Sequence, residues 1–373
     1  MAHAYTPGLK VLEFAVVEKQ RRLPLPGEIT VAKGAKVAAE QVVASTYLPG
    51  NVQTVNVTGL LGVLPEEIDE AMLKKAGDPV HKGEIMGQNK GLFGLFKSQV
   101  RSPINGKIES ISKITGQVIM REPPIPVQVI AYIDGLVIDV FKNEGVTVQT
   151  KGSFIQGIFG IGGEVIGELA MAVDKPDQVL TEKEINKDFK DKILIGGSMV
   201  TYDAMIKARD AGAKGIIVGG IEDQDLKKFM GYDIGVAITG SEKVGLTLIA
   251  TEGFGILTMA AHTFNLLKSL VGKKASINGA TQIRAGVMRP EVIVPLDTPA
   301  KKESHISSGS GLDIGMNVRI IREPYFGAIG KVMGLPVALQ TIDTEAKVRV
   351  LEVELPDGRK AVLPRANVEI IEE

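Results

Sequence analysis

The sequence predicts a multidomain α+β protein with β-rich ends and an α/β middle. Glycine is abundant, at 43 of 373 residues, and it recurs between short apolar segments in the first half. Strands then alternate with helices, and short strands return near the end. We expect a β region over 1–173, a linker over 174–191, an α/β module over 192–296, a second linker over 297–315 and a small β domain over 316–373.

The N-terminal region repeats one short unit. A glycine, a spacer, Val or Ile and further alternating apolar residues lead to another glycine. Period-2 alternation indicates half-buried strands, and the glycines supply the positive φ of tight turns. The region is therefore predicted to form small antiparallel sandwiches, with units that begin at Gly27, Gly50, Gly106 and Gly135.

Residues 77–118 resemble the biotinyl/lipoyl-like barrel-sandwich hybrid family. The segments GDPVHKGE and SPINGKI match its two half-repeats, and the resemblance extends over about residues 22–170. Carriers of this family modify a lysine in a hairpin, here expected between Gly83 and Ser102, but neither Lys90 nor Lys97 has the family's surroundings. We therefore expect no cofactor. Non-carrier members act as rigid adaptors in larger machines, which is what the resemblance implies here.

A glycine-flanked apolar loop interrupts this region. The sequence GLFGLF either packs back on the sandwich or forms a partner-docking tip, because exposed apolar clusters mark interfaces. The docking residues would be Leu92, Phe93, Leu95 and Phe96.

The middle segment follows a strand–helix pattern. Strands are expected at 193–195, 214–218 and 246–250, and helices at 201–211, 222–230 and 258–271. This alternation predicts a parallel or mixed sheet. Two of the strands end in Gly-Gly before a helix, where anions bind in open α/β sheets. The candidate anion ligands are Gly196, Gly197, Ser198, Gly219, Gly220, Arg284 and Arg289; the alternative is that the glycines only permit tight turns.

Enzymatic chemistry is not favoured. Cysteine is absent, so thiol nucleophiles and Cys-ligated metal sites are excluded, and the wide spacing of the four histidines does not favour a His-rich metal site. The most concentrated polar residues lie over 250–290, and no catalytic triad, paired carboxylates or metal spacing can be recognised there. An enzyme or anion sensor that uses the central crevice remains an alternative.

The last segment resembles the KOW motif of NusG-type transcription factors and some ribosomal proteins. VRIIREPYFGAIGKV carries the likeness, and Asp357-Gly358 predicts a hairpin, so we expect an SH3-like β-barrel. Family members bind RNA, ribosomal proteins or polymerase-associated partners. Residues 316–373 hold 8 Lys and Arg against 9 Asp and Glu, which favours protein over RNA as the partner. The candidate contact residues are Arg319, Arg322, Phe326, Gly327, Gly330 and Lys331.

The sequence thus favours a non-catalytic, multidomain adaptor that binds protein partners. Its net charge of −1 excludes a globally basic nucleic-acid binder, although RNA binding through the KOW segment stays an alternative. No signal peptide and no charge-free run of 18 apolar residues is present, so we expect a cytoplasmic protein without a membrane span.

Overall fold

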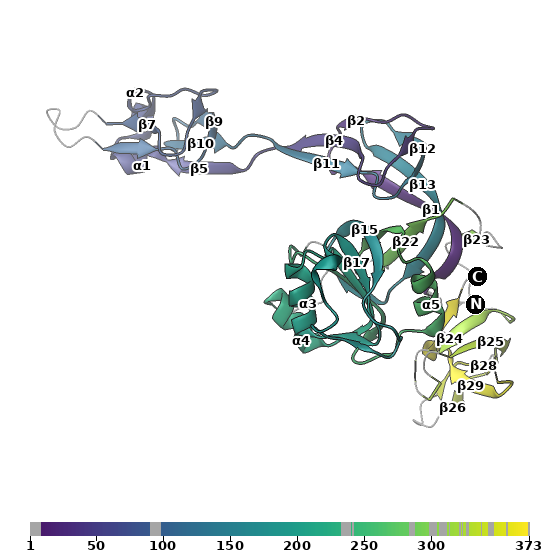
Figure 1. Ribbon diagram of the computed structural model, residues 1–373. Coiled ribbons are helices and arrows are strands. Elements are labelled where there is room, and N and C mark those ends of the chain that lie inside the picture. The colour runs from purple at the N-terminus through teal and green to yellow at the C-terminus, as the bar shows by residue number, and fades with distance from the viewer. Residues whose placement is uncertain are drawn as a thin grey trace.

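The computed structural model shows a base, an arm that projects from it and a distal unit at the end of the arm (Figure 1). We call residues 157–297 the base, 23–48 and 125–144 the arm, 51–121 the distal unit and 316–371 the C-terminal unit; the long strands at 11–22 and 145–156 run from the base into the arm. The residues described are 9–89, 98–232, 240, 242–282, 288–297, 304–305, 312, 314–320, 322, 324–325, 328–336, 338–341, 347–355 and 357–371.

One mixed sheet organises the base. Strands β15, β17, β19 and β20 run parallel, and the remaining neighbours on the main path up to β1 pair antiparallel. The order is β14 (Phe159–Ile161), β20 (Thr247–Phe254), β19 (Gly215–Ile221), β17 (Lys192–Ile195), β15 (Glu164–Met171), β21 (Lys274–Asn278), β22 (Glu291–Pro295), β13 (Gly145–Gln156), β1 (Val11–Arg22) and β23 (Ser304–His305). Two short strands, β16 (Val179–Leu180) and β18 (Met199–Val200), extend it at the side.

Helices connect the parallel strands, as the alternation predicts. Thr201 caps the first helix, because its hydroxyl accepts a hydrogen bond from the Ala204 amide at 3.3 Å. Gly231 ends the second with a φ of 79°. The helices are α3 (Tyr202–Asp210), α4 (Asp223–Met230) and α5 (Ala261–Ser269), with the 3₁₀ turn η2 (Lys187–Phe189).

Strands β14 and β15 lie in the central sheet, although the sequence pattern groups them with the N-terminal β region. β15 pairs with β17 on one side and with β21 on the other. Ile161 and Leu169 accordingly belong to the core of the base. The change from arm to base falls near residue 157, ahead of the expected linker.

The arm grows out of the base without a break in the sheet. β1 and β13 pair from Val11–Ile155 to Arg22–Gly145, with one register shift between Leu12 and Ala15. A second core fills the arm root and includes Ile293 of β22, and its members Val17, Val43 and Val137 are fully or almost fully buried. The further arm strands are β2 (Glu28–Ile29), β3 (Lys36–Val37), β4 (Val42–Leu48), β11 (Ile125–Ile130) and β12 (Gly135–Phe141).

The distal unit is inserted between β4 and β11. Its core includes Val57, Ile68, Met86, Ile108 and Met120, and it shares no residue with the other cores. Its elements are β5 (Val52–Asn56), α1 (Val57–Leu61), η1 (Pro65–Glu67), α2 (Ile68–Ala71), β6 (Pro79–Val80), β7 (Ile85–Gln88), β8 (Gln99–Arg101), β9 (Gly106–Ile111) and β10 (Gln117–Arg121).

The C-terminal unit is an antiparallel sheet of five strands in the order β29-β28-β25-β24-β30. The α+β class is thus confirmed, but neither this sheet nor the arm and distal sheets close into a barrel among the described residues. The elements are β24 (Asn317–Ile320), β25 (Ile329–Gly334), β26 (Gln340–Thr341), β27 (Lys347–Val348), β28 (Val350–Glu354), β29 (Lys360–Pro364), η3 (Arg365–Asn367) and β30 (Val368–Ile371).

Within the described residues, no helix is long and apolar enough to cross a membrane.

Candidate functional site

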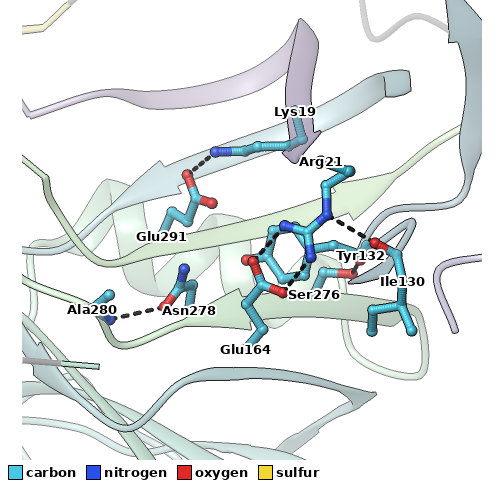
Figure 2. A network of polar contacts seen from close by, with 9 residues as sticks. All are labelled: Lys19, Arg21, Ile130, Tyr132, Glu164, Ser276, Asn278, Ala280 and Glu291. Atoms are coloured by element: carbon cyan, nitrogen blue, oxygen red, sulfur yellow. Dashed lines mark hydrogen bonds and ion pairs between the residues drawn. The ribbon is translucent and has the colours of Figure 1, made fainter. Parts of the chain in front are cut away.

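A polar network joins the arm to the base (Figure 2). The Arg21 guanidinium, at the arm end of β1, donates to both carboxylate oxygens of Glu164 at 2.6 Å. Its Nε also donates to the carbonyl of Ile130 at 2.8 Å. On the same strand, Lys19 forms an ion pair with Glu291 of β22. Two cations of the arm strand are therefore held by two carboxylates of the base.

Tyr132 lies at the centre of this network. It is 1% exposed, and the Arg21 guanidinium sits 5.2 Å from the centre of its ring. Its backbone has a φ of 71° and is fixed by two hydrogen bonds, from its amide to Ala39 and from the Ser276 hydroxyl to its carbonyl. Burial and the Glu291 and Glu164 carboxylates raise the pKa of the phenol well above its usual range. This environment keeps the phenol neutral and unsuited to act as a nucleophile.

A second polar joint connects the C-terminal unit to the base. Arg319 of β24 pairs with Glu252 of β20 at 2.9 Å, and their side chains are only 5% and 2% exposed. Glu252 also accepts from the Thr251 hydroxyl at 3.2 Å and from the Ala260 amide at 3.1 Å. A buried charge pair with additional hydrogen bonds ties two units that are far apart in sequence.

Three amides of the Gly-Gly turns are already used in backbone hydrogen bonds. The amides of Gly196, Ser198 and Gly219 donate to the backbone carbonyls of Ile217, Gln178 and Gly197 at 2.7–2.9 Å. A Cβ on Gly219 would lie 2.0 Å from the Leu257 carbonyl, and one on Gly220 would lie 2.0 Å from the Gly255 carbonyl.

The segment 255–259 therefore lies directly on these turns. This packing supports the alternative that the glycines permit close approach. Gly197 is buried in the same turn and Arg289 is half-buried, whereas Arg284 lies outside the described residues. Anion binding stays a prediction.

The polar residues over 250–290 have structural partners. Glu252 is held in the joint to Arg319. The Asn278 side chain accepts from the Ala280 amide at 2.9 Å, and the Thr281 hydroxyl accepts from the Gly160 amide at 2.9 Å. No group of three or more His, Asp or Glu side chains in the described residues is arranged to hold a metal ion.

Only some of the predicted contact residues of the KOW-like segment are exposed. Arg319, predicted as a contact residue, is buried against Glu252, so it is not available to RNA or a partner, because its charge is used inside the molecule. Arg322 and Lys331 are exposed. Gly330 is buried in β25, where a Cβ would lie 2.2 Å from a methyl carbon of Val353. Phe326 and Gly327 lie outside the described residues, as do Leu92, Phe93, Leu95 and Phe96 of the proposed docking loop.

Apolar side chains are exposed on the distal unit. Leu60, Leu64 and Leu73 lie on or beside its helices and are 63%, 61% and 54% exposed. Ile114, in the turn between β9 and β10, is 89% exposed. Exposed apolar side chains mark a contact surface where they form one contiguous patch, so the distal unit is a candidate for partner contact.

The sequence interpretation did not anticipate Arg21, Glu164, Lys19, Glu291 and Tyr132. Each lies in an ordinary strand or turn, and the partners are more than a hundred residues apart, so no local motif marks them. The one usable signal is alternation, since Lys19 and Arg21 occupy the same face of β1.

Comparisons with known proteins do not place the chain in a family. No protein-family model matches the chain, and no curated protein is significantly similar to it.

Proposed function

We propose that the protein is a non-catalytic adaptor, in which a fixed base holds out an arm that binds a protein partner through the distal unit. The observation that carries this proposal is the β1–β13 pairing, which runs without a register shift from Ala15–Gly152 to Arg22–Gly145 and is reinforced by the Arg21–Glu164 and Lys19–Glu291 ion pairs. An arm secured by both main-chain hydrogen bonds and half-buried charge pairs keeps a constant orientation.

The distal unit is the part of the arm suited to meet a partner. It has a separate core and exposed Leu60, Leu64 and Leu73, and it stands away from the base (Figure 1). The likeness of the N-terminal half to lipoyl-like domains supports the same function, because non-carrier members act as rigid adaptors. The KOW-like unit would serve as a second protein contact through its exposed Arg322 and Lys331.

Removal of the distal unit tests the proposal. Residues 52–121 are replaced by Asn-Gly, since the Glu122 amide donates to the Asn51 carbonyl at 2.9 Å and a two-residue turn can close the ribbon between these opposed residues. The shortened chain is expected to keep the circular dichroism and cooperative melting of the base. Cross-linking mass spectrometry in the source cells is expected to show a partner linked to the distal unit of the full chain and lost from the shortened chain. Retention of the same complex by the shortened chain would contradict the proposal.

A further inference from the structure

The distal sheet has one long open edge among the described residues. Its order is β5-β10-β9-β6, so β5 and β6 are the outer strands. β6 has only two residues, whereas β5 has five and, within the part of the chain that the structure describes, pairs with β10 alone. A full-length edge strand offers a row of backbone groups to another strand unless charge, proline or a cover blocks it.

The register identifies which groups of β5 face outward. The amide of Glu122 donates to Asn51, and these two residues stand opposite each other in the extension of the β5–β10 register. Hydrogen-bonded and non-bonded pairs alternate in an antiparallel ladder, so Gln53 and Val55 bond to β10. Val52 and Thr54 therefore direct both their N–H and C=O groups to the open edge, and Asn56 directs its N–H there. The exposed Gln53 side chain donates a long hydrogen bond of 3.4 Å to the Thr54 carbonyl, which a pairing strand would replace.

The composition of β5 suits pairing with itself. Val52, Gln53, Thr54, Val55 and Asn56 carry no charge, so two copies face each other without like-charge repulsion. Four of the five are exposed, Val52 at 50%. Natural edges use lysine or an inward-pointing charge to prevent such pairing, and β5 has neither.

We propose that two copies of the chain associate through β5, antiparallel about a two-fold axis at Thr54. Thr54 would then face Thr54 of the second copy and exchange two backbone hydrogen bonds with it, and each Asn56 N–H would donate to the Val52 carbonyl opposite. The arrangement gives about four hydrogen bonds and joins two four-stranded sheets into one. Threonine pairs across antiparallel strands are favourable, and an isologous contact of this kind closes after two copies.

In such a dimer the distal units of two chains are in contact, and the two bases lie apart. The exposed Leu60, Leu64 and Leu73 are not part of the β5 edge, so dimer formation and partner binding are separate properties. Failure of one does not imply failure of the other.

A single introduced cysteine tests the pairing register directly, because the natural chain contains no cysteine. Opposed Cα atoms in a hydrogen-bonded antiparallel pair lie about 5.5 Å apart, within the range that a disulfide spans. On mild oxidation, Thr54→Cys is expected to form a covalent dimer of twice the 39.8 kDa chain mass. Ser110→Cys is the matched control, because Ser110 is exposed on β9, an inner strand of the same sheet, and is expected to stay monomeric.

Sedimentation of the uncross-linked chain completes the test. The natural chain and Ser110→Lys are expected to dimerise, and Thr54→Lys, which places like charges at the two-fold axis, is expected to be monomeric with an unchanged melting temperature. Dimers that persist in Thr54→Lys, or equal cross-linking of both cysteine variants, would show that the contact lies elsewhere. A natural chain that remains monomeric at its highest soluble concentration would also overturn the proposal, and would leave the edge to an extended strand of a different protein.

Discussion

The buried ion pair between Arg319 and Glu252 gives the sharpest stability prediction. Arg319→Met keeps a long unbranched side chain but leaves the Glu252 carboxylate in a site where it is 2% exposed. The carboxylate retains the Thr251 hydroxyl and the Ala260 amide, but the guanidinium that balanced its charge is gone. Breaking one side of a buried pair costs about 3–5 kcal/mol of unfolding free energy, a large part of the stability of an ordinary domain.

Urea unfolding measures this loss of unfolding free energy, and limited proteolysis shows which part of the chain is destabilised. Arg319→Met is expected to lose about 3 kcal/mol or more and to become sensitive to cleavage between the base and the C-terminal unit. The double variant Arg319→Met with Glu252→Gln should recover much of the loss, because neither charge is then buried alone.

Arg359→Met is the matched control within the same unit. It removes a pair to Asp357 whose side chains are 68% and 49% exposed, so water screens the attraction and the loss of stability should be far smaller than that of Arg319→Met. A loss from Arg319→Met no larger than that of the control, or a double variant that simply adds the two single losses, would refute the reasoning.

Three further predictions concern the arm and the distal unit. The pKa of the Tyr132 phenol is raised in the folded chain, so the contribution of this phenol to the free energy of unfolding is complete below pH of about 10 and is lost as the pH rises further. Tyr132→Phe should therefore show a smaller fall in melting temperature from pH 9 to pH 11 than the natural chain. Gly50→Ala should destabilise the junction of arm and distal unit, since its Cβ would lie 2.0 Å from the Glu122 carbonyl; faster hydrogen exchange confined to the adjoining strands β5 and β10 is expected, and unchanged exchange would contradict it. Gly116→Ala combines a φ of +68° with a Cβ placed 1.7 Å from the Thr58 hydroxyl oxygen, so it should lower the stability of the distal unit by more than about 1 kcal/mol in urea unfolding, and a neutral effect would show that the turn rearranges.

Local patterns were sufficient to predict several elements of the base. The apolar run at 193–195 is a strand, and the helices that start after Thr201 and stop at Gly231 follow from capping residues in the sequence. The boundary near residue 157 was not predicted, because β14 and β15 have the same glycine-punctuated alternation as the arm strands. Which sheet a short strand joins depends on distant partners, and alternation alone does not specify them.

The candidate sites were harder to predict, for a related reason. Arg319 resembles a surface cation in the sequence, yet its partner is Glu252, 67 residues earlier. In the sequence the Gly-Gly turns resemble an anion site, because the glycines leave the backbone bare. The sequence does not reveal that the segment at 255–259 packs against that backbone. Burial and pairing of polar groups arise from the assembled units, so local spacing does not reveal them.

The most direct test of the adaptor function is cross-linking mass spectrometry of the full chain and of the chain in which residues 52–121 are replaced by Asn-Gly, both expressed at natural levels in the source cells. The account predicts that one partner protein cross-links to the distal unit of the full chain. It also predicts that this partner is lost from the shortened chain, whose base remains folded by circular dichroism. A partner that stays bound to the shortened chain through the base or the C-terminal unit would contradict the account.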